Sequence, residues 1–472
     1  MSDKMNKVVT GGGMGVRTLA LLNVAAVLSI RNLPSQAEYG WSIIFYLTAA
    51  SVCFFLPSAL VSAELASGWR ENGGVYLWVK EAFGPRWGFV AIAMQWLENL
   101  PWFPAVLTFV AEAIAYVIDP ELAKNRMFVF MVILIALWGG TWLNFKGMKL
   151  SAFLSSSGAV LGTMIPGILI ILLAACFVGS GKELATPFSA KALIPDLGSW
   201  NQWMLLSGMM VALSGMEMSA VHVTEVANPM KNFPKAIFIC CIIVILLSVL
   251  GSLGISLIIP ANDISLAAGT LQAFDAMLSA FHLKWMVPIV SFLLAYGAVT
   301  MVITWILGPS KGLLEVAKEG YLPEYWQYRN ENGMPTHILI LQAAISSLLS
   351  LVIFFMPTIS GAFWIMSALT AQLYMIMYLF MFAAAIKLRY SKPDVPRPYR
   401  IPGGKLGMWL VSGIAFLTAL LAIVVGFIPT SNVRAEGTAA QVGYVAFLFL
   451  GSLFFMAIPL FLYHVYEKKK KI

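Results

Sequence analysis

Two ionisable side chains lie in the middle of long apolar runs in this sequence. Arg31 occurs in NVAAVLSIRNLPSQAEYG, and Glu217 occurs in VALSGMEMSAVHVTEVANP. At the centre of a membrane an arginine costs about 2.5–3.5 kcal/mol on insertion scales, and an unpaired glutamate costs roughly as much. Both are tolerated if they face a common wet cavity and one another. We therefore expect an Arg31–Glu217 pair with a structural role, contacts from these side chains to a bound molecule, or each in turn.

The residues around these two charges interrupt the helix. Pro34 removes a helix hydrogen bond and disfavours helix at the residue before it, and Gly215 permits local unwinding. Unless they are mere packing kinks, such interruptions line a cavity, because unwound backbone at membrane depth is tolerated only there. Free N–H groups can then bind a carboxylate and free carbonyls an ammonium group, and an α-amino acid presents both. The candidate binding residues at the interruptions are Ser29, Arg31, Asn32, Ser214, Gly215 and Glu217.

Further polar and aromatic residues are candidates for a role in the same cavity. Glu98, in AMQWLENLPWFPAV, is either a proton carrier or a structural hydrogen-bond partner. His222 is either a buried structural histidine or a pH-sensitive gate. Tyr374 and Tyr378 share one helix face because they are four residues apart, and with Trp305 they either pack helices or line the cavity. The sequence contains no HExxH or GxSxG pattern, so we expect no catalytic residues, no metal and no cofactor.

The elements that carry these residues are membrane-spanning helices. Of the 472 residues, 60% are hydrophobic and 11% are charged, whereas a soluble protein carries roughly a quarter charged residues. Twelve apolar runs are about as long as a spanning helix requires, and none shows the ten-residue alternation of a membrane barrel. The runs are 16–38, 42–66, 88–118, 126–145, 152–179, 203–226, 236–259, 286–307, 338–356, 361–386, 408–428 and 442–464. We predict an all-α membrane protein with twelve transmembrane helices.

The two interrupted runs are the first and the sixth, so they hold matching positions in two halves of five helices. Matched interruptions of this kind indicate a transporter built from an inverted repeat. The predicted organisation is a cytoplasmic leader at 1–15, a transport core at 16–386 with repeats at 16–179 and 203–386, a basic cytoplasmic loop at 387–407, two further helices at 408–464 and a basic tail at 465–472.

Basic residues set the orientation. Of the 30 Lys and Arg residues, 23 fall in the leader, the tail and the even-numbered connections. By the positive-inside rule, both termini face the cytoplasm of a multi-pass protein in the inner (plasma) membrane of a bacterium. This asymmetry also explains the net charge of +8, so the expected surroundings are a lipid bilayer and no nucleic acid. The four cysteines all fall within predicted spans, and we expect no disulfide.

Four longer motifs resemble one transporter family. They read AELASGWRENGGVYLWVKEAFGPRWGF, MEMSAVHVTEVANPMKNFPKA, WILGPSKGLLEVAKEGYLPEYWQYRNENGMP and RPYRIPGGK. The sequence resembles the amino acid–polyamine–organocation superfamily, and within it the bacterial glutamate/GABA antiporters. The resemblance implies the leucine-transporter fold, with substrate between discontinuous helices 1 and 6, and amino-acid exchange without ATP. It implies that Glu217 is the acid of helix 6, Trp305 a gate and Tyr374 and Tyr378 pocket residues.

Two departures from the family pattern leave the substrate and the pH dependence open. The first interruption reads SIRNLPS, so an arginine changes the charge of the pocket. No C-terminal plug follows HVYEKKKKI, so we expect activity to persist near neutral pH. Besides an amino-acid antiporter, we consider a proton-coupled symporter with Glu98 or Glu217 as carrier, a membrane-embedded enzyme, and a channel, although no filter motif is present.

Overall fold

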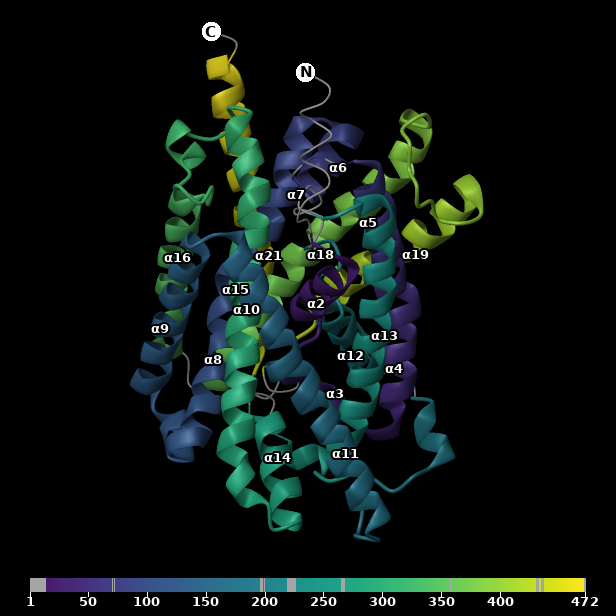
Figure 1. Cartoon of the computed structure of the whole chain (residues 1–472), viewed down its shortest axis with the longest axis vertical. Coiled ribbons are helices and arrows are strands. Elements are labelled where there is room, and N and C mark those ends of the chain that lie inside the picture. The colour runs from purple at the N-terminus through teal and green to yellow at the C-terminus, as the bar shows by residue number, and fades with distance from the viewer. Residues whose placement is uncertain are drawn as a thin grey trace.

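The structure is a computed structural model that describes residues 14–69, 71, 73–195, 198, 200–218, 226–264, 268–355, 359–429, 433 and 437–470. Long helices lie side by side along the long axis of the molecule (Figure 1). In the described part, eleven helices are long and apolar enough to cross a membrane. They are Val16–Ala37, Gly40–Gly68, Pro85–Ile118, Arg126–Phe145, Met148–Gly179, Lys231–Ser256, Lys284–Lys318, Thr336–Phe355, Ile365–Ser391, Gly404–Gly426 and Thr438–Lys469.

The sixth predicted run is the one that forms no spanning helix in the described residues. Its first part is α12 (Trp200–Ala212), a helix of 13 residues. The chain is then non-helical over 213–217, which we name the second break, and residues 219–225 with His222 lie outside the described residues. The difference from twelve predicted spans thus arises from the predicted interruption itself.

The first predicted run is interrupted as well. It forms α2 (Val16–Val27), a 3₁₀ turn at Ile30–Asn32 and α3 (Leu33–Ala37). Leu28 and Ser29 have extended backbone, and we name them the first break. Pro34 stands at the start of α3, where a missing N–H costs nothing and the fixed φ suits a helix. The two predicted interruptions are therefore both present.

Two other spans contain a wide π-helical turn that the sequence pattern does not predict. One is Ser51–Phe55, between α4 (Ile43–Ala50) and α5 (Leu56–Gly68). The other is Ala159–Met164, between α10 (Met148–Gly158) and α11 (Ile165–Gly179). In the second of these, Gly162 contacts Gly297 of α15 (Val287–Lys318) so closely that a Cβ on Gly162 would lie 2.3 Å from the Gly297 Cα.

The helices divide into a buried centre and a lipid-facing perimeter. In the span formed by α7 (Pro85–Leu97) and α8 (Asn99–Ile118), 72% of an 18-residue apolar stretch is buried inside the protein. In α21 (Thr438–Lys470) the corresponding share is only 17%. Large apolar side chains on peripheral helices are exposed, among them Phe153 and Phe461. Such a surface is stable in acyl chains and not in water, as expected for a membrane protein.

A buried ion pair fixes one end of the bundle. Glu64 of α5 accepts from Arg389 Nε at 2.6 Å and from the Ile401 N–H at 2.8 Å. Arg389 lies near the end of α18 (Ile359–Ser391), and Ile401 lies in the connection to α19 (Gly404–Gly426). The predicted loop 387–407 is therefore shorter than expected, because α18 continues to Ser391 and α19 begins at Gly404.

The remaining described α-helices, which are 4 to 28 residues long, complete the helix bundle. They are α6 (Val75–Phe83), α9 (Arg126–Phe145), α13 (Pro229–Ser256), α14 (Gly269–Ala280), α16 (Thr336–Ser350) and α17 (Val352–Phe355).

Candidate substrate-binding site

The second break depends on a glycine. Gly215 has a φ of +119°, a conformation that side-chain-bearing residues rarely adopt. Its N–H donates to the Tyr378 hydroxyl at 2.8 Å. A Cβ at this position would lie 3.1 Å from the Trp305 ring and 3.2 Å from the Ala26 carbonyl oxygen. Glycine therefore allows the second break to approach the first helix and the tryptophan closely.

Glu217, at the end of the second break, is held by three neutral donors. Tyr374 donates to its Oε1 at 2.6 Å, Tyr378 donates to its Oε2 at 2.6 Å, and Gln95 Nε2 donates to Oε1 at 2.8 Å. The side chain is only 1% exposed. A buried carboxylate is stable only when its oxygens are hydrogen-bonded, and these contacts meet that requirement without a cation.

Trp305 of α15 links the second break to the first. Its indole N–H donates to the Ala26 carbonyl at 3.1 Å. Because α2 ends at Val27, this carbonyl lies in the last turn, where helix carbonyls lack partners of their own helix. The ring also packs edge-on against Tyr374, with 5.6 Å between centroids, and against Trp102 at 5.4 Å. The Trp305 indole therefore donates to a carbonyl oxygen that lacks an intrahelical partner because the helix is interrupted.

The expected Arg31–Glu217 pair is wrong for this structure. Both Glu217 oxygens accept from Tyr374, Tyr378 and Gln95. Glu112 of α8, which is 7% exposed, is a buried carboxyl close enough to Arg31 for their charges to interact. The reason is positional: Glu217 faces α18, where Tyr374 and Tyr378 donate to it.

The remaining candidates at the breaks make local contacts. Ser214 donates to the Met210 carbonyl at 3.2 Å, and the Asn32 carbonyl accepts from Ser35 Oγ at 2.8 Å. Ser29 is half-buried in extended backbone. The structure thus brings Gly215, Glu217, Trp305, Tyr374 and Tyr378 into one connected group and places Ser29, Arg31, Asn32 and Ser214 beside it.

The helix α14 covers the first break on one side. Thr270 Oγ1 donates to the Ile30 carbonyl at 3.0 Å. Gly269 lies so close to Pro34 that an added Cβ would be 2.6 Å from the proline Cβ. The start of α14 therefore packs directly against the residues that follow the first break.

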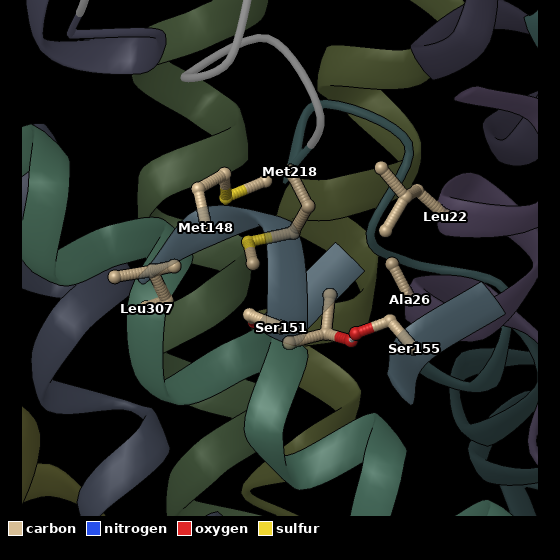
Figure 2. A pocket seen from close by; sticks show the side chains of 8 residues that line it. Leu22, Ala26, Met148, Ser151, Ser155, Met218 and Leu307 are labelled. Carbon is tan, nitrogen blue, oxygen red and sulfur yellow. Dashed lines mark hydrogen bonds between the residues drawn. The ribbon is translucent and has the colours of Figure 1, made fainter. Parts of the chain in front are cut away.

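On the opposite side a narrow pocket reaches the breaks. Figure 2 shows Met148 and Met218 extending into it, with Ser155 across from them. Ser155 and Thr304 are joined by a hydrogen bond of 2.6 Å. The cavity volume is about 10 Å³, close to the space that one water needs, so this pocket is too small for an amino acid. The pocket is lined by Leu22, Ala26, Met148, Ser151, Ser155, Met218, Thr304 and Leu307.

Glu98 lies next to this group, between α7 and α8. Its side chain is 2% exposed, and the charge of Glu217 acts on it. Glu98 Oε1 has no hydrogen-bond partner among the described residues, and the same holds for Gln95 Oε1 and Asn99 Oδ1. One turn of this span therefore presents several buried acceptors beside Glu217. Such a cluster is suited to a proton or to a donor group.

Two contributing residues were not among the sequence candidates. Gln95 contacts Glu217, and Trp102 packs on Trp305. The signal for Gln95 was available, because an amide inside an apolar run must find a buried partner. Trp102 gave no comparable signal, since interface and packing tryptophans have the same appearance in sequence.

Comparisons with known proteins bear on the family and the fold. The family described as amino acid permease matches residues 14–462. The chain is 41% identical to an uncharacterized transporter of Legionella pneumophila, over 94% of this chain and 95% of that protein. It is 30% identical to a glutamate/gamma-aminobutyrate antiporter of Lactococcus lactis subsp. lactis, over 95% of this chain and 90% of that protein.

A solved structure shows the same fold. The crystal structure of MhsT in complex with L-phenylalanine superposes with a TM-score of 0.60 at 13% identity, over 87% of this chain and 98% of that chain. This likeness confirms the predicted leucine-transporter architecture, with its interrupted first and sixth helices.

Proposed function

This chain belongs to the amino acid permease family, and on that premise we propose that it is an antiporter that exchanges amino acids by alternating access. The observation that carries the proposal is the contact of the two breaks through Gly215, Trp305 and Ala26. Two interrupted helices that meet at membrane depth expose backbone donors and acceptors to one small volume, which is what a zwitterionic substrate requires.

The backbone groups at the breaks would hold the α-amino and α-carboxylate groups of the substrate. In the present closed conformation the Trp305 indole N–H occupies the Ala26 carbonyl. When the tryptophan swings away, this carbonyl becomes available to an ammonium group. The negative charge of Glu217, two residues beyond Gly215, favours the same cation. Trp305 is therefore the gate of the site, and Glu217 with its two tyrosines forms one wall.

Arg31 gives the pocket a preference for carboxylates. A guanidinium stays charged in every state of the cycle, and the buried carboxyl of Glu112 lies within reach of its charge. A substrate with a second carboxylate can replace Glu112 as the partner of the guanidinium. The relative named as a glutamate/gamma-aminobutyrate antiporter supports an acidic substrate. If Arg31 and Glu112 stay paired throughout, the pocket wall is nearly neutral and suits neutral amino acids.

A second function, proton-coupled symport, is favoured by one specific observation. Glu98 is buried beside Glu217, and its Oε1 has no hydrogen-bond partner among the described residues. Two carboxyls in one buried site cannot both ionise at low cost. One proton shared between them could therefore be carried with the substrate.

The proposed location is the inner membrane of a bacterium, with both termini in the cytoplasm. The basic residues are concentrated in the leader, the tail and the connections on the same side. The described end of α21 lies at the same end of the bundle as α6 and α7 (Figure 1). Lys468 and Lys469 are exposed there.

Uptake into proteoliposomes preloaded with single amino acids tests the proposed function. Internal amino acids that are substrates should accelerate the uptake of labelled glutamate and other labelled amino acids. Glu217→Gln should reduce that acceleration strongly, whereas Glu315→Gln, in a solvent-accessible i,i+3 pair with Lys318, should leave it unchanged. Failure of every internal amino acid to accelerate uptake would overturn the proposal.

A further inference from the structure

A groove lies between α7 and α21, remote from the two breaks and independent of the proposed function. Its lining residues are Arg86, Leu460, Tyr463, His464 and Glu467, and its cavity volume is about 360 Å³. This is within the range of roughly 300–1,000 Å³ that small-molecule sites occupy. The ring of Tyr463 is held in place on one side of the groove, because it stacks on Tyr321 with 4.8 Å between centroids.

The groove lies where phospholipid headgroups must be. One span begins at Pro85, directly before Arg86, and another ends at Lys469, just after Glu467. Trp87, which is 37% exposed, stacks on Phe380 at 5.6 Å. Aromatic residues of this kind mark the membrane–water interface.

Apolar side chains of α21 adjoin the Leu460 end of the groove, which suits acyl chains. Leu460 lines it one turn before His464. On the same helix, the side chains of Phe461 and Phe454 are 67% and 63% exposed. A molecule in the groove therefore has a polar interface on one side of it and hydrocarbon on the other.

The charged groups in the groove are complementary to a phosphate ester. Arg86 is exposed, and its guanidinium lies over the Trp87 ring at 5.4 Å, so the planar donors are held in place. His464 is exposed on the facing helix, and Lys468 follows one turn later. Arginine is the side chain best matched to phosphate oxygens. Glu467 is the one carboxylate of the lining, and it only accepts hydrogen bonds.

We propose that this groove binds a glycerophospholipid, with Arg86 and His464 on the phosphate and the acyl chains along α21. Glu467 then faces the group attached to the phosphate. Ethanolamine and glycerol can donate a hydrogen bond to Glu467, whereas choline has no donor and can only be attracted by its charge. The site is selective for the headgroup as well as for the phosphate.

Thermal unfolding of the purified full-length protein in detergent tests this site. A ligand that binds only the folded state raises the unfolding temperature as its concentration rises. Dihexanoyl-phosphatidylethanolamine or dihexanoyl-phosphatidylglycerol should raise it with saturation, and dihexanoyl-phosphatidylcholine should need an about tenfold higher concentration. Arg86→Gln and His464→Gln should each raise the half-saturating concentration about tenfold. Both side chains are exposed, so neither change should prevent folding.

Lys146→Gln is the matched control, because Lys146 also lies over an interfacial ring, Trp142 at 4.7 Å, but does not line the groove. It should leave the titration unchanged. Equal half-saturation in Arg86→Gln, His464→Gln and the wild type would overturn the site. Equal potency of the choline lipid would overturn the headgroup selectivity. Saturation by glycerol 3-phosphate at the same concentration as the lipids would show a soluble-phosphate site and would overturn the lipid assignment.

Discussion

A carboxylate buried in a helix bundle normally needs a cation, and Glu217 shows the alternative. Tyr374, Tyr378 and Gln95 surround it with neutral donors. Each hydrogen bond to a charged group contributes about 1.5–3 kcal/mol, so three of them can offset the cost of burying the charge. An arginine is therefore unnecessary at this position.

At this scale the sequence identified residues better than it identified their partners. Glu217 and Arg31 were recognisable because charges are costly in apolar runs. Their pairing was not, because hydropathy says nothing about the direction in which a side chain leaves its helix. Tyr374 and Tyr378 followed from a spacing of four, whereas Gln95 was overlooked among the apolar residues around it.

Replacement of Gly215 by alanine should be strongly damaging. The positive φ is strained for alanine by about 1–3 kcal/mol, and the new methyl group would contact Trp305 and the Ala26 carbonyl. We expect a clear fall in unfolding temperature and loss of exchange. The control is Gly208→Ala in α12, where a Cβ meets nothing within 4 Å. Equal behaviour of the two variants in thermal unfolding and uptake would contradict the geometry of the second break.

Arg31 and Glu112 should depend on one another. Arg31→Ala removes the cation that favours the charged form of the buried Glu112, and this costs up to about 3–5 kcal/mol where that carboxyl is ionised. Adding Glu112→Gln should restore thermal stability, and adding Glu217→Gln should not. If Arg31 binds the substrate carboxylate, the restored double variant still fails to bind acidic amino acids. Rescue by Glu217→Gln instead would show that the pairing was assigned to the wrong acid.

Glu38 should make stability depend on pH. It follows α3, just beyond the first span, and burial raises its pKa from 4.5 to about 7. Between these values the folded protein retains a proton that the unfolded chain releases. Stability should therefore fall as pH rises from about 4.5 to 7 and then level off. Glu38→Gln should remove this part of the slope in unfolding temperature against pH, and an unchanged slope would exclude Glu38 as its source.

At the scale of elements, the two breaks were predictable and the two π-helical turns were not. Pro34 and Gly215 predict an interruption, because proline lacks a backbone N–H and glycine permits local unwinding. By contrast, SVCFF and AVLGTM are ordinary apolar helix sequences. The wide turn in the second of them coincides with the contact between Gly162 and Gly297. A contact between residues so distant in sequence leaves no periodic signal.

The ends of the helices were also set by tertiary contacts. The basic motif RPYRIPGGK falls in the predicted loop 387–407, where Arg397 donates to the Leu388 carbonyl at 2.8 Å and Ile401 donates to Glu64. These contacts attach the connection to α5 and to the last turns of α18. Extension of α18 beyond the predicted end at 386 accompanies this packing.

The Glu64–Arg389 pair should be important for stability at this end of the bundle. Glu64 is 1% exposed and Arg389 is 8% exposed, and loss of one partner from a buried pair costs about 3–5 kcal/mol. Glu64→Gln should therefore lower the unfolding temperature, and addition of Arg389→Gln should recover part of the loss. The control is Glu315→Gln, which removes a solvent-accessible pair and should cost about 0–1 kcal/mol. A Glu64→Gln protein as stable as the control would show that the pair is not needed.

At the scale of the whole molecule, composition and run length predicted the architecture almost completely. An apolar perimeter, a buried centre and two interrupted helices all follow from where charges, prolines and glycines fall in the apolar runs. The conformational state did not follow from the sequence. The contact of α14 with the residues after the first break and the small pocket of about 10 Å³ are properties of packing that no sequence pattern predicts.

The most direct test of exchange is the rate of labelled amino-acid uptake into proteoliposomes that are empty or loaded with the same unlabelled amino acid, with and without an imposed proton gradient. An antiporter needs a substrate to return through the occluded state, so uptake into loaded vesicles should be at least about tenfold faster. The proton gradient should change neither rate. Equal uptake by empty and loaded vesicles, accelerated by an inward proton gradient, would contradict exchange and establish symport.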